Sequence, residues 1–494
     1  LRIVARVLRR RDFNMENQKL DDYFGYTEAG SSLEGEVRAG ITTFLTMAYI
    51  LVVNPDMLSL SFAPGVGIPF NQALFATAMA AFVGCTIMGL WANQPYALAP
   101  GMGLNAYFAF TVVLSQGIAW ELALAAVLVE GVLFMIISLP QVGWRSEMIN
   151  SIPKDLKIAT MAGIGMFLAI IGLREMGWII DDGATLVNIG AHGGWTHQSG
   201  ELWAMIGLIA IAIMMARGMK GAIIYGIAGV TAIAWIMGAM DMGVSDPYNG
   251  IEAVAAPAMG DIFSTDGFDT GAFGASLSAL MDINGDTIGA FILVMVTFLF
   301  VDIFDTAGTL YGVGKMAGKV DDDDNIENAD EAFMADAGAT IVGALCGTST
   351  TTTYIESAAG IEEGGKTGLV AVVVGVLMLM GLFLAGLLQA IPTFAVAPAL
   401  VVVGAMMMRG AAEIDWSDKE MAIPAFITMV MMPFTYSIAD GIAWGIIAYV
   451  LMKIGMGKMD QINKVMGTLC VLMVMFYLGP GSETTFEWLV NMIF

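Results

Sequence analysis

Two sets of acidic side chains lie inside strongly apolar stretches of this sequence. Asp302 and Asp305, in TFLFVDIFDTAG, are three residues apart, so on a helix they share one face. Glu356 follows a run of hydroxyl-bearing residues, Thr348 to Tyr354. An ionisable side chain within a membrane is costly, so each is a candidate functional residue. The alternatives that stay open are a structural hydrogen bond for Asp302 and a helix cap for Asp305.

The composition indicates that these apolar stretches lie in a membrane. The chain has 494 residues, 57% hydrophobic and 13% charged, whereas a soluble protein carries about 25% charged residues. The net charge of −24 argues against nucleic acid as a partner. Its histidines are His192 and His197, and two such ligands do not make a metal site. The sequence predicts an all-α polytopic membrane protein surrounded by lipid, without a metal or other cofactor.

Apolar runs and basic residues predict the number and orientation of the segments. Lys and Arg gather in the N-terminal segment and after even-numbered runs, and these residues mark the cytoplasmic side. We therefore expect a cytoplasmic N-terminus and an external acidic loop at 241–287. The sequence does not assign a membrane topology to a fifteenth run, 465–479. The other fourteen runs are 38–54, 73–92, 97–116, 120–140, 156–173, 202–216, 221–240, 288–310, 332–346, 350–361, 367–389, 394–408, 421–437 and 439–456.

Two polar breaks in these runs share a pattern. ALAPGMGLNAY (97–107) and ALCGTSTTTTY (344–354) have Ala, Leu and Tyr in common at an offset of 247 positions. The breaks belong to the third and tenth runs, so an odd separation gives them opposite orientations in the membrane. Paired breaks of this kind point to a transporter's site near the membrane midplane. The open alternative is that Gly and Pro are common in membrane helices anyway.

The breaks carry groups that could bind a polar ring. Unwound backbone at 347–352 would have to line a cavity or bind something, and a helix start beyond it would favour an electron-rich partner. The hydroxyls could satisfy this backbone or bond back to helix carbonyls. Asn105 offers a donor and an acceptor together. Glu130, in the fourth run, is a further buried acid with no obvious partner.

Several motifs give the chain a family resemblance that runs from about residue 20 to 456. It resembles the adenine/guanine/hypoxanthine permeases of the azaguanine-resistance type, in the second nucleobase–cation symporter family. The resemblance implies a transporter and not an enzyme. An intramembrane aspartyl protease would need its two aspartates on separate helices, and a channel would conduct without a purine. The motifs are GITTFLTMAYILVVNP (40–55), APGMGLNAYFAF (99–110), DTAGTLYGVGKMAG (305–318) and YIESAAGIEEGGKTGLVAVVVG (354–375).

The fold that this resemblance implies is of the uracil-permease type. It has about 14 transmembrane segments as 7+7 inverted repeats, with short strands in segments 3 and 10. A core domain comes from segments 1–4 and 8–11, and a gate domain from segments 5–7 and 12–14. The implied divisions are a basic N-terminal segment at 1–36, core at 37–140, gate at 141–240, the acidic loop at 241–287, core at 288–390, gate at 391–457 and a C-terminal segment at 458–494.

The same resemblance implies import of adenine, guanine or hypoxanthine, with xanthine as a further candidate, across the plasma membrane. The coupled cation is expected to be H+ by analogy, with Na+ as the open alternative, and a homodimer is expected by analogy only. A sulfate-type anion carrier on the same fold, or a carrier of another nucleobase such as uracil, is the competing hypothesis. The resemblance implies roles for Gly103, Asn105, Asp302, Asp305 and Glu356. With backbone amides added, the expected substrate-binding residues are Gly103, Asn105, Asp302, Thr353, Ile355 and Glu356, and the expected proton-coupling residues are Asp302, Asp305 and Glu356.

Overall fold

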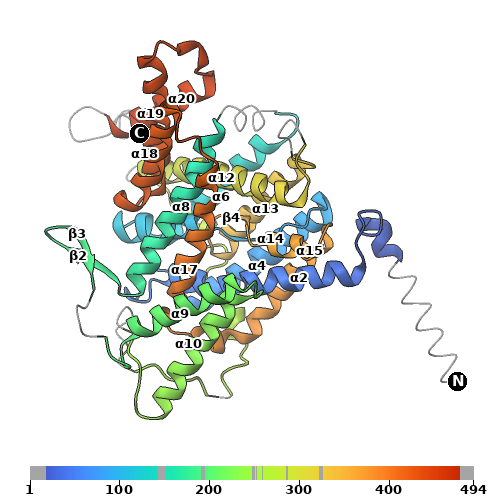
Figure 1. Ribbon diagram of the computed structural model, residues 1–494, viewed down its shortest axis with the longest axis vertical. Helices are drawn as coiled ribbons and strands as arrows, with labels where there is room; N and C mark the ends of the chain where they lie inside the picture. The colour runs from blue at the N-terminus through green and yellow to red at the C-terminus, as the bar shows by residue number, and fades with distance from the viewer. Residues whose placement is uncertain are drawn as a thin grey trace.

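The computed structural model describes residues 18–142, 152–190, 195–246, 251, 253–258, 260–284, 287–321 and 326–478. Most of this chain is helical (Figure 1). Within these ranges, nine helices are long and apolar enough to cross a membrane. Helical segments also occupy the remaining predicted runs, as shorter, broken or more polar helices. The expectations for His192 and for residues 1–17 and 479–494 fall outside the described ranges.

The first half of the chain is helical, with one strand in the third segment and a hairpin after the fifth. Its long elements begin and end close to the predicted runs. They are α2 (Leu33–Met47), α3 (Ile50–Ser59), α4 (Phe70–Ile87) with a π-helical end (Met88–Ala92), β1 (Leu98–Pro100), α5 (Met102–Ala106) continued by a π-helix (Tyr107–Ser115), α6 (Trp120–Ser138), α8 (Lys154–Glu175), β2 (Ile179–Asp182), β3 (Leu186–Ile189), α9 (Gly200–Ala216) and α10 (Ala222–Ala239).

The second half repeats this plan, with its strand in the tenth segment. The fifteenth run forms a helix, α20, that packs on α19. The elements are α11 (Ala275–Met281), α12 (Ile288–Ala317), α13 (Ala329–Cys346), β4 (Thr351–Thr353), α14 (Ser357–Glu362), α15 (Leu369–Met380), α16 (Ala385–Gln389), α17 (Thr393–Met407), α18 (Lys419–Thr435), α19 (Ile438–Gly455) and α20 (Lys464–Tyr477), with 3-10 turns at Asp266–Phe268, Gly381–Leu384, Met408–Glu413 and Met459–Gln461.

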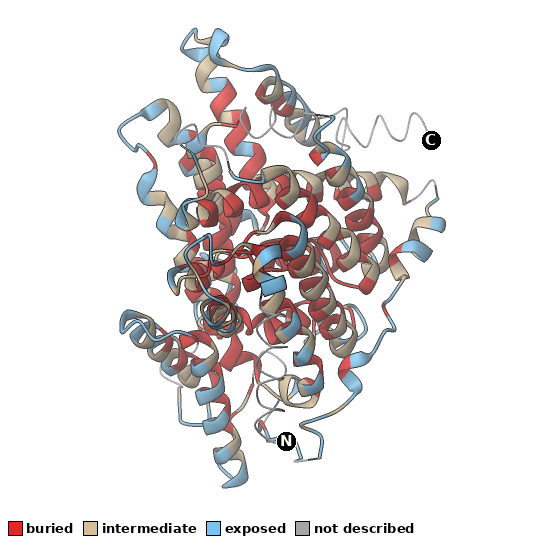
Figure 2. Cartoon of the chain, turned by 90° about the vertical axis from the view of Figure 1, so that its right-hand side faces the viewer, coloured by how far each residue is buried: buried red, intermediate tan, exposed pale blue. Residues whose placement is uncertain are grey.

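The helices pack as two groups. In the first, α8 packs against α17 and α18, α9 against α10 and α17, and α18 against α19. In the second, α4 packs against α3, α13 and α15, and α6 packs against α12 and α13. Figure 1 shows α8 and α17 side by side in the centre, with α18 and α19 above them and α9 and α10 below. Buried residues concentrate where the helices meet (Figure 2).

Strands β1 and β4 join two segments that are far apart in sequence. They pair antiparallel, with Leu98 opposite Thr353 and Pro100 opposite Thr351. The strands predicted in segments 3 and 10 are thus confirmed. The repeat register is different, however, because Leu98 and Thr351, the first residues of the strands, are 253 positions apart and not 247. The matching tyrosines are not equivalent, since Tyr107 lies beyond α5 whereas Tyr354 directly follows β4.

A threonine from a neighbouring helix completes the hydrogen bonding of β4. The hydroxyl of Thr340, on α13, donates to the carbonyl of Thr351 at 3.1 Å and accepts from its amide at 3.0 Å. All three strand residues are buried. An unpaired backbone group at such a depth is expensive because no water replaces the partner. Thr340 therefore acts as a third strand would.

The acidic loop at 241–287 also packs against the helices. Its helix α11 packs against α6 and α13. The amide of Gly274 donates to the carbonyl of Leu345, at the end of α13, at 2.8 Å. The side chain of Asp246 accepts from the amide of Thr393, at the start of α17, at 2.9 Å. This loop is therefore attached to the helix ends and does not extend freely into solvent.

We expect Thr340→Val to lower the thermal unfolding midpoint of the purified protein. The change keeps the shape of the side chain but leaves the amide and carbonyl of Thr351 without a partner, at a cost of about 1–3 kcal/mol for each buried group. Thr86→Val is the matched control, because the Thr86 hydroxyl donates only to the Phe82 carbonyl of its own helix. Equal unfolding midpoints for the two variants would contradict this role.

Candidate functional site

A small pocket, lined by apolar side chains and a few polar ones, lies where both broken segments meet α8, α12 and α17. Its volume is about 40 Å3. Five of the predicted site residues line it, whereas Asn105 and Asp302 do not. The lining residues are Gly101, Met102, Gly103, Ile164, Leu168, Asp305, Thr309, Thr352, Thr353, Tyr354, Ile355, Glu356, Val403 and Met407.

Glu356 is fixed at the wall of this pocket by a tyrosine from the first segment. The hydroxyl of Tyr49, in the turn between α2 and α3, donates to Oε1 of Glu356 at 2.5 Å. Both side chains are buried. Directly after Glu356, the Ser357 hydroxyl accepts from the amide of Ala97 at 2.9 Å, which ties the start of α14 to β1. Tyr49 was not among the predicted site residues, although it lies inside the motif at 40–55, because its contact with Glu356 depends on tertiary packing.

Asp336, on α13, is a second acid of the site that sequence analysis missed. Its carboxylate accepts from the amide of Thr353 at 3.3 Å and from the hydroxyls of Thr353 at 3.0 Å and Thr352 at 3.4 Å. It is fully buried. The signal was present, because Asp336 lies in the ninth apolar run and every acid in such a run is a candidate.

The amides at the end of β4 and directly after it are less available to a ligand than the sequence suggested. The amide of Thr353 donates to Asp336, and that of Tyr354 donates to the carbonyl of Ala97 at 2.9 Å. The amide of Ile355 has no acceptor within the described residues. Among these three, it is the donor that remains for a bound molecule.

The hydroxyls of the threonine run bind side chains of neighbouring segments. Nδ2 of Asn54 donates to the hydroxyl of Thr348 at 3.1 Å, and the hydroxyl of Ser349 donates to Oδ1 of Asn105. The hydroxyls of Thr306 and Thr352 are 3.2 Å apart. The expectation that these hydroxyls form hydrogen bonds with their own unwound backbone is therefore wrong for these residues. Asn105 thus links the two breaks without lining the pocket.

Close helix packing, and not only access for a ligand, requires a glycine at position 103. A Cβ atom at this position would lie 2.7 Å from Cγ2 of Ile164, on α8, and 3.2 Å from Cδ1 of Ile438, on α19. Both distances are shorter than ordinary van der Waals contact. Gly103 therefore permits α5, which also packs against α3 of the second group, to approach α8 and α19 of the first group at the edge of the pocket.

Asp302 lies away from the pocket and faces another acid. It is fully buried on α12, and its carboxyl group lies within hydrogen-bonding reach of the carboxyl group of Glu130, on α6. No N–H or hydroxyl donor reaches either carboxyl group within the described chain. Asp305, one helical turn away, lines the pocket instead. The partner that Glu130 lacked in the sequence is thus Asp302.

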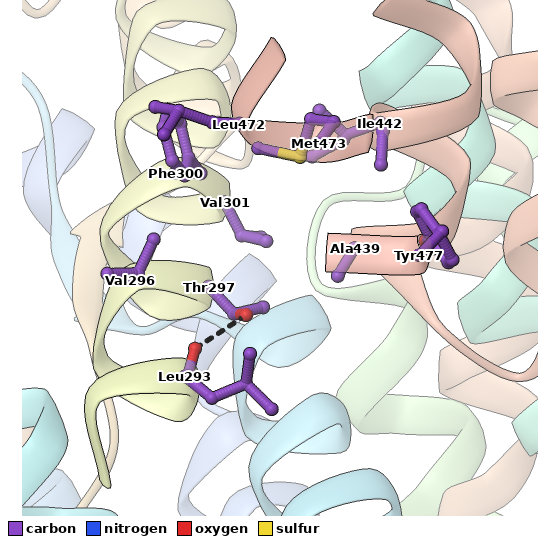
Figure 3. Close-up of a pocket in the computed structure, with 11 residues that line it drawn as sticks. Leu293, Val296, Thr297, Phe300, Val301, Ala439, Ile442, Leu472, Met473 and Tyr477 are labelled. Atoms are coloured by element: carbon purple, nitrogen blue, oxygen red, sulfur yellow. Dashed lines mark hydrogen bonds between the residues drawn. The ribbon is translucent and has the colours of Figure 1, made fainter. Parts of the chain in front are cut away.

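A larger cavity lies between α12, α19 and α20, but it offers little for polar recognition (Figure 3). Its volume is about 170 Å3, and apolar side chains such as Val296, Phe300 and Leu472 line most of it. The Thr297 hydroxyl there donates to the Leu293 carbonyl at 2.9 Å. None of the predicted site residues lines this cavity. Within the described residues, no group of three His, Cys, Asp or Glu side chains could hold a metal ion.

Comparisons with known sequences identify a family. The model described as the Permease family matches residues 34–444. The guanine/hypoxanthine permease PbuG of Bacillus subtilis is 39% identical over 460 residues, which cover 92% of this chain and 99% of that protein. The adenine permease AdeP of Escherichia coli is 36% identical over 455 residues, which cover 92% of this chain and 94% of that protein.

Comparisons with solved structures concern the fold. The transmembrane domain of the cyanobacterial bicarbonate transporter BicA matches with a TM-score of 0.58 at 13% identity, over 85% of this chain and 96% of that domain. The inward-facing murine Solute Carrier 26 family member A9 anion transporter matches with a TM-score of 0.57 at 10% identity, over 86% and 69%. The predicted fold class is thus confirmed. The chain belongs to the permease family and is a multi-pass membrane transporter, related in sequence to permeases named for guanine/hypoxanthine and for adenine.

Proposed function

We propose that this chain imports purine nucleobases (adenine, guanine or hypoxanthine, with xanthine as a further candidate) across the plasma membrane, together with H+. The observation that carries the proposal is Glu356, a buried acid that Tyr49 holds at the wall of a pocket between two broken segments. The named activities of the relatives from Bacillus subtilis and Escherichia coli support it. Na+ is the alternative coupling ion.

A purine presents N–H donors and ring-nitrogen acceptors along its edge, and the pocket offers matching groups. Glu356 accepts from an N–H of the base while Tyr49 occupies its other oxygen. The amide of Ile355 donates to a ring nitrogen. Asp305 lines the same pocket and serves a further polar group. Asn105 positions this arrangement through Ser349 without contacting the base.

The acids of the pocket favour a nucleobase over an anion. Both structural relatives described above are anion transporters, but that likeness concerns the fold alone. In this chain the pocket wall carries Asp305 and Glu356, and its lining residues include no Lys or Arg. Carboxylates next to a bound anion would repel it, whereas they attract N–H groups. A sulfate-type carrier is therefore the weaker hypothesis.

Alternating access is the mechanism that fits the two packing groups. The pocket, at about 40 Å3, is far smaller than the roughly 300 Å3 at which pockets for drug-sized ligands begin, so a base enters only when the groups separate. The hydroxyl of Thr393, on α17, donates to Asp56, on α3, at 3.1 Å. Elsewhere Lys220, between α9 and α10, pairs with Glu363, after α14. These contacts join the two packing groups, and we expect them to break and re-form as the site opens to one side and then the other.

Uptake by the purified protein in lipid vesicles tests the proposed function. We expect saturable uptake of at least one of adenine, guanine, hypoxanthine and xanthine, driven by an inward proton gradient and unchanged by sodium. Bicarbonate and sulfate, offered under the same conditions, should not accumulate. Uptake of either anion without uptake of any purine would overturn the proposal in favour of an anion carrier. A preference for uracil over the purines would show that the substrate is a different nucleobase.

We expect Glu356→Gln to weaken purine binding by about 10- to 100-fold, because a hydrogen bond to a charged group contributes about 1.5–3 kcal/mol. Glu362→Gln is the matched control, since Glu362 is an exposed acid on the helix that follows Glu356. The measurement is the dissociation constant of the labelled purine with protein in detergent. Equal affinities for the two variants would exclude Glu356 as the recognition residue.

We expect Gly103→Ala to slow uptake, and Ile164→Ala in the same chain to restore part of it. The reason is the 2.7 Å approach that a new Cβ atom would make to Ile164, which keeps the two packing groups apart. Gly312→Ala is the control, because nothing lies within 4 Å of the corresponding Cβ position on α12. The initial rate of vesicle uptake reports the effect. No rescue by Ile164→Ala would indicate that Gly103 acts on the ligand and not on helix approach.

A further inference from the structure

Glu130 and Asp302 form an isolated pair of acids between α6 and α12. Both side chains are fully buried, and their carboxyl groups lie within hydrogen-bonding reach of each other. None of their four carboxyl oxygens accepts a hydrogen bond from an N–H or hydroxyl donor in the described part of the chain. Each carboxyl group is therefore the other's polar partner.

Two carboxylates cannot both stay ionised in such surroundings. A buried charge without a counter-ion is costly, and two like charges side by side cost more. A hydrogen bond between two carboxyl groups also requires a proton on one of them. The pair therefore holds one proton and one negative charge, or two protons and no charge. Taking up one H+ converts the first form into the second, and releasing it reverses the change.

The acids around this pair connect it to the pocket. Asp336, from α13, and Asp305, on α12 itself, are close enough to act on Asp302 electrostatically. The other helices packed against α12 (α5, α8, α14 and α19) place no described Lys, Arg or His in an ion pair with Asp302 or Glu130. Asp336 holds the amide and hydroxyl of Thr353, and Asp305 lines the pocket. A change of charge on the pair therefore alters the electrostatic potential at Thr353, through Asp336, and at the pocket, through Asp305.

We propose that Glu130 and Asp302 share a proton and together form the proton-holding site of this transporter. This inference rests on the proposed purine transport. The singly protonated pair takes up H+ from the outside, and the pair becomes neutral before the core moves past the apolar gate. The same proton leaves on the cytoplasmic side after the base. Glu130 thereby gains a role that Asp302 alone could not perform, because a single acid offers no shared proton.

The test compares Glu130→Gln with Glu121→Gln, a half-buried acid at the start of the same helix. Two assays are run in vesicles: accumulation driven by a proton gradient, and exchange of labelled for unlabelled purine at equal pH. For wild type, a gradient of one pH unit supports about tenfold accumulation at a 1:1 ratio of proton to base. We expect Glu130→Gln to retain exchange but to lose accumulation above equilibrium, whereas Glu121→Gln behaves as wild type.

The outcomes separate this inference from the proposed function. Gradient-driven accumulation by Glu130→Gln equal to that of wild type would overturn the shared-proton site while leaving purine transport intact. Wild-type accumulation that follows sodium and not pH would overturn it in the same way. Absence of purine uptake by wild type would instead remove the proposed function itself.

Infrared spectroscopy of the wild-type protein keeps the inference testable even if Glu130→Gln does not fold. A protonated carboxyl group absorbs as a carbonyl and shifts in D2O, so the shared proton should give such a band at neutral pH. Glu130→Asp keeps the carboxyl group at a shorter reach, and we expect it to move this band. No band in the wild type, or a band that Glu130→Asp and Asp302→Glu leave unchanged, would overturn the shared-proton site.

Discussion

Unwound backbone inside an apolar environment needs a hydrogen-bond partner for every amide and carbonyl group, and the rest of this site depends on how that requirement is met. The third and tenth segments satisfy each other through the β1–β4 pair, with Leu98 opposite Thr353. Two strands leave outer edges, and on β4 side chains of α13 fill that edge: Thr340 at Thr351 and Asp336 at Thr353. Polar residues inside the second packing group are therefore a consequence of breaking two helices there.

The strand pair also makes the two breaks a single unit. The Ser357 hydroxyl binds the amide of Ala97, and the Tyr354 hydroxyl donates to the carbonyl of Pro100 at 2.5 Å. The start of α14 is thus held against β1 from both sides. A base that binds between the breaks meets a rigid wall, so the movement that admits it must occur between packing groups. Gly103, at that boundary, has no side chain to obstruct it.

Four buried acids of this core, Glu36, Asp336, Glu356 and Asp302, differ in the kind of group that contacts them. Glu36 accepts from the amides of Lys366 and Thr367, both at 3.0 Å, which joins α2 to the start of α15. Asp336 accepts similarly from β4. Glu356 receives a single tyrosine hydroxyl at the wall of the pocket, which suits recognition of an N–H group. Asp302 faces only another acid, so a proton must take the place of a donor.

Much of this protein could be predicted from its sequence because the relevant signals are local. Hydropathy is read along the chain, so the apolar segments and both breaks were located close to where the helices and strands lie. An acid in an apolar run is conspicuous by itself, which is why Asp302, Asp305 and Glu356 were found. Asp336 was detectable by the same reasoning and was overlooked.

The sequence by itself determined the segments, the positions of their breaks, the family and most of the acids, because composition and contiguous motifs are properties of neighbouring residues. Only the tertiary structure decided that Asp305 and not Asp302 lines the pocket, that Tyr49 holds Glu356, and that Glu130 meets Asp302. These pairings depend on how each helix is rotated and in what register it packs. Rotation and register are set by the combined packing of many side chains, so no local stretch of sequence specifies them.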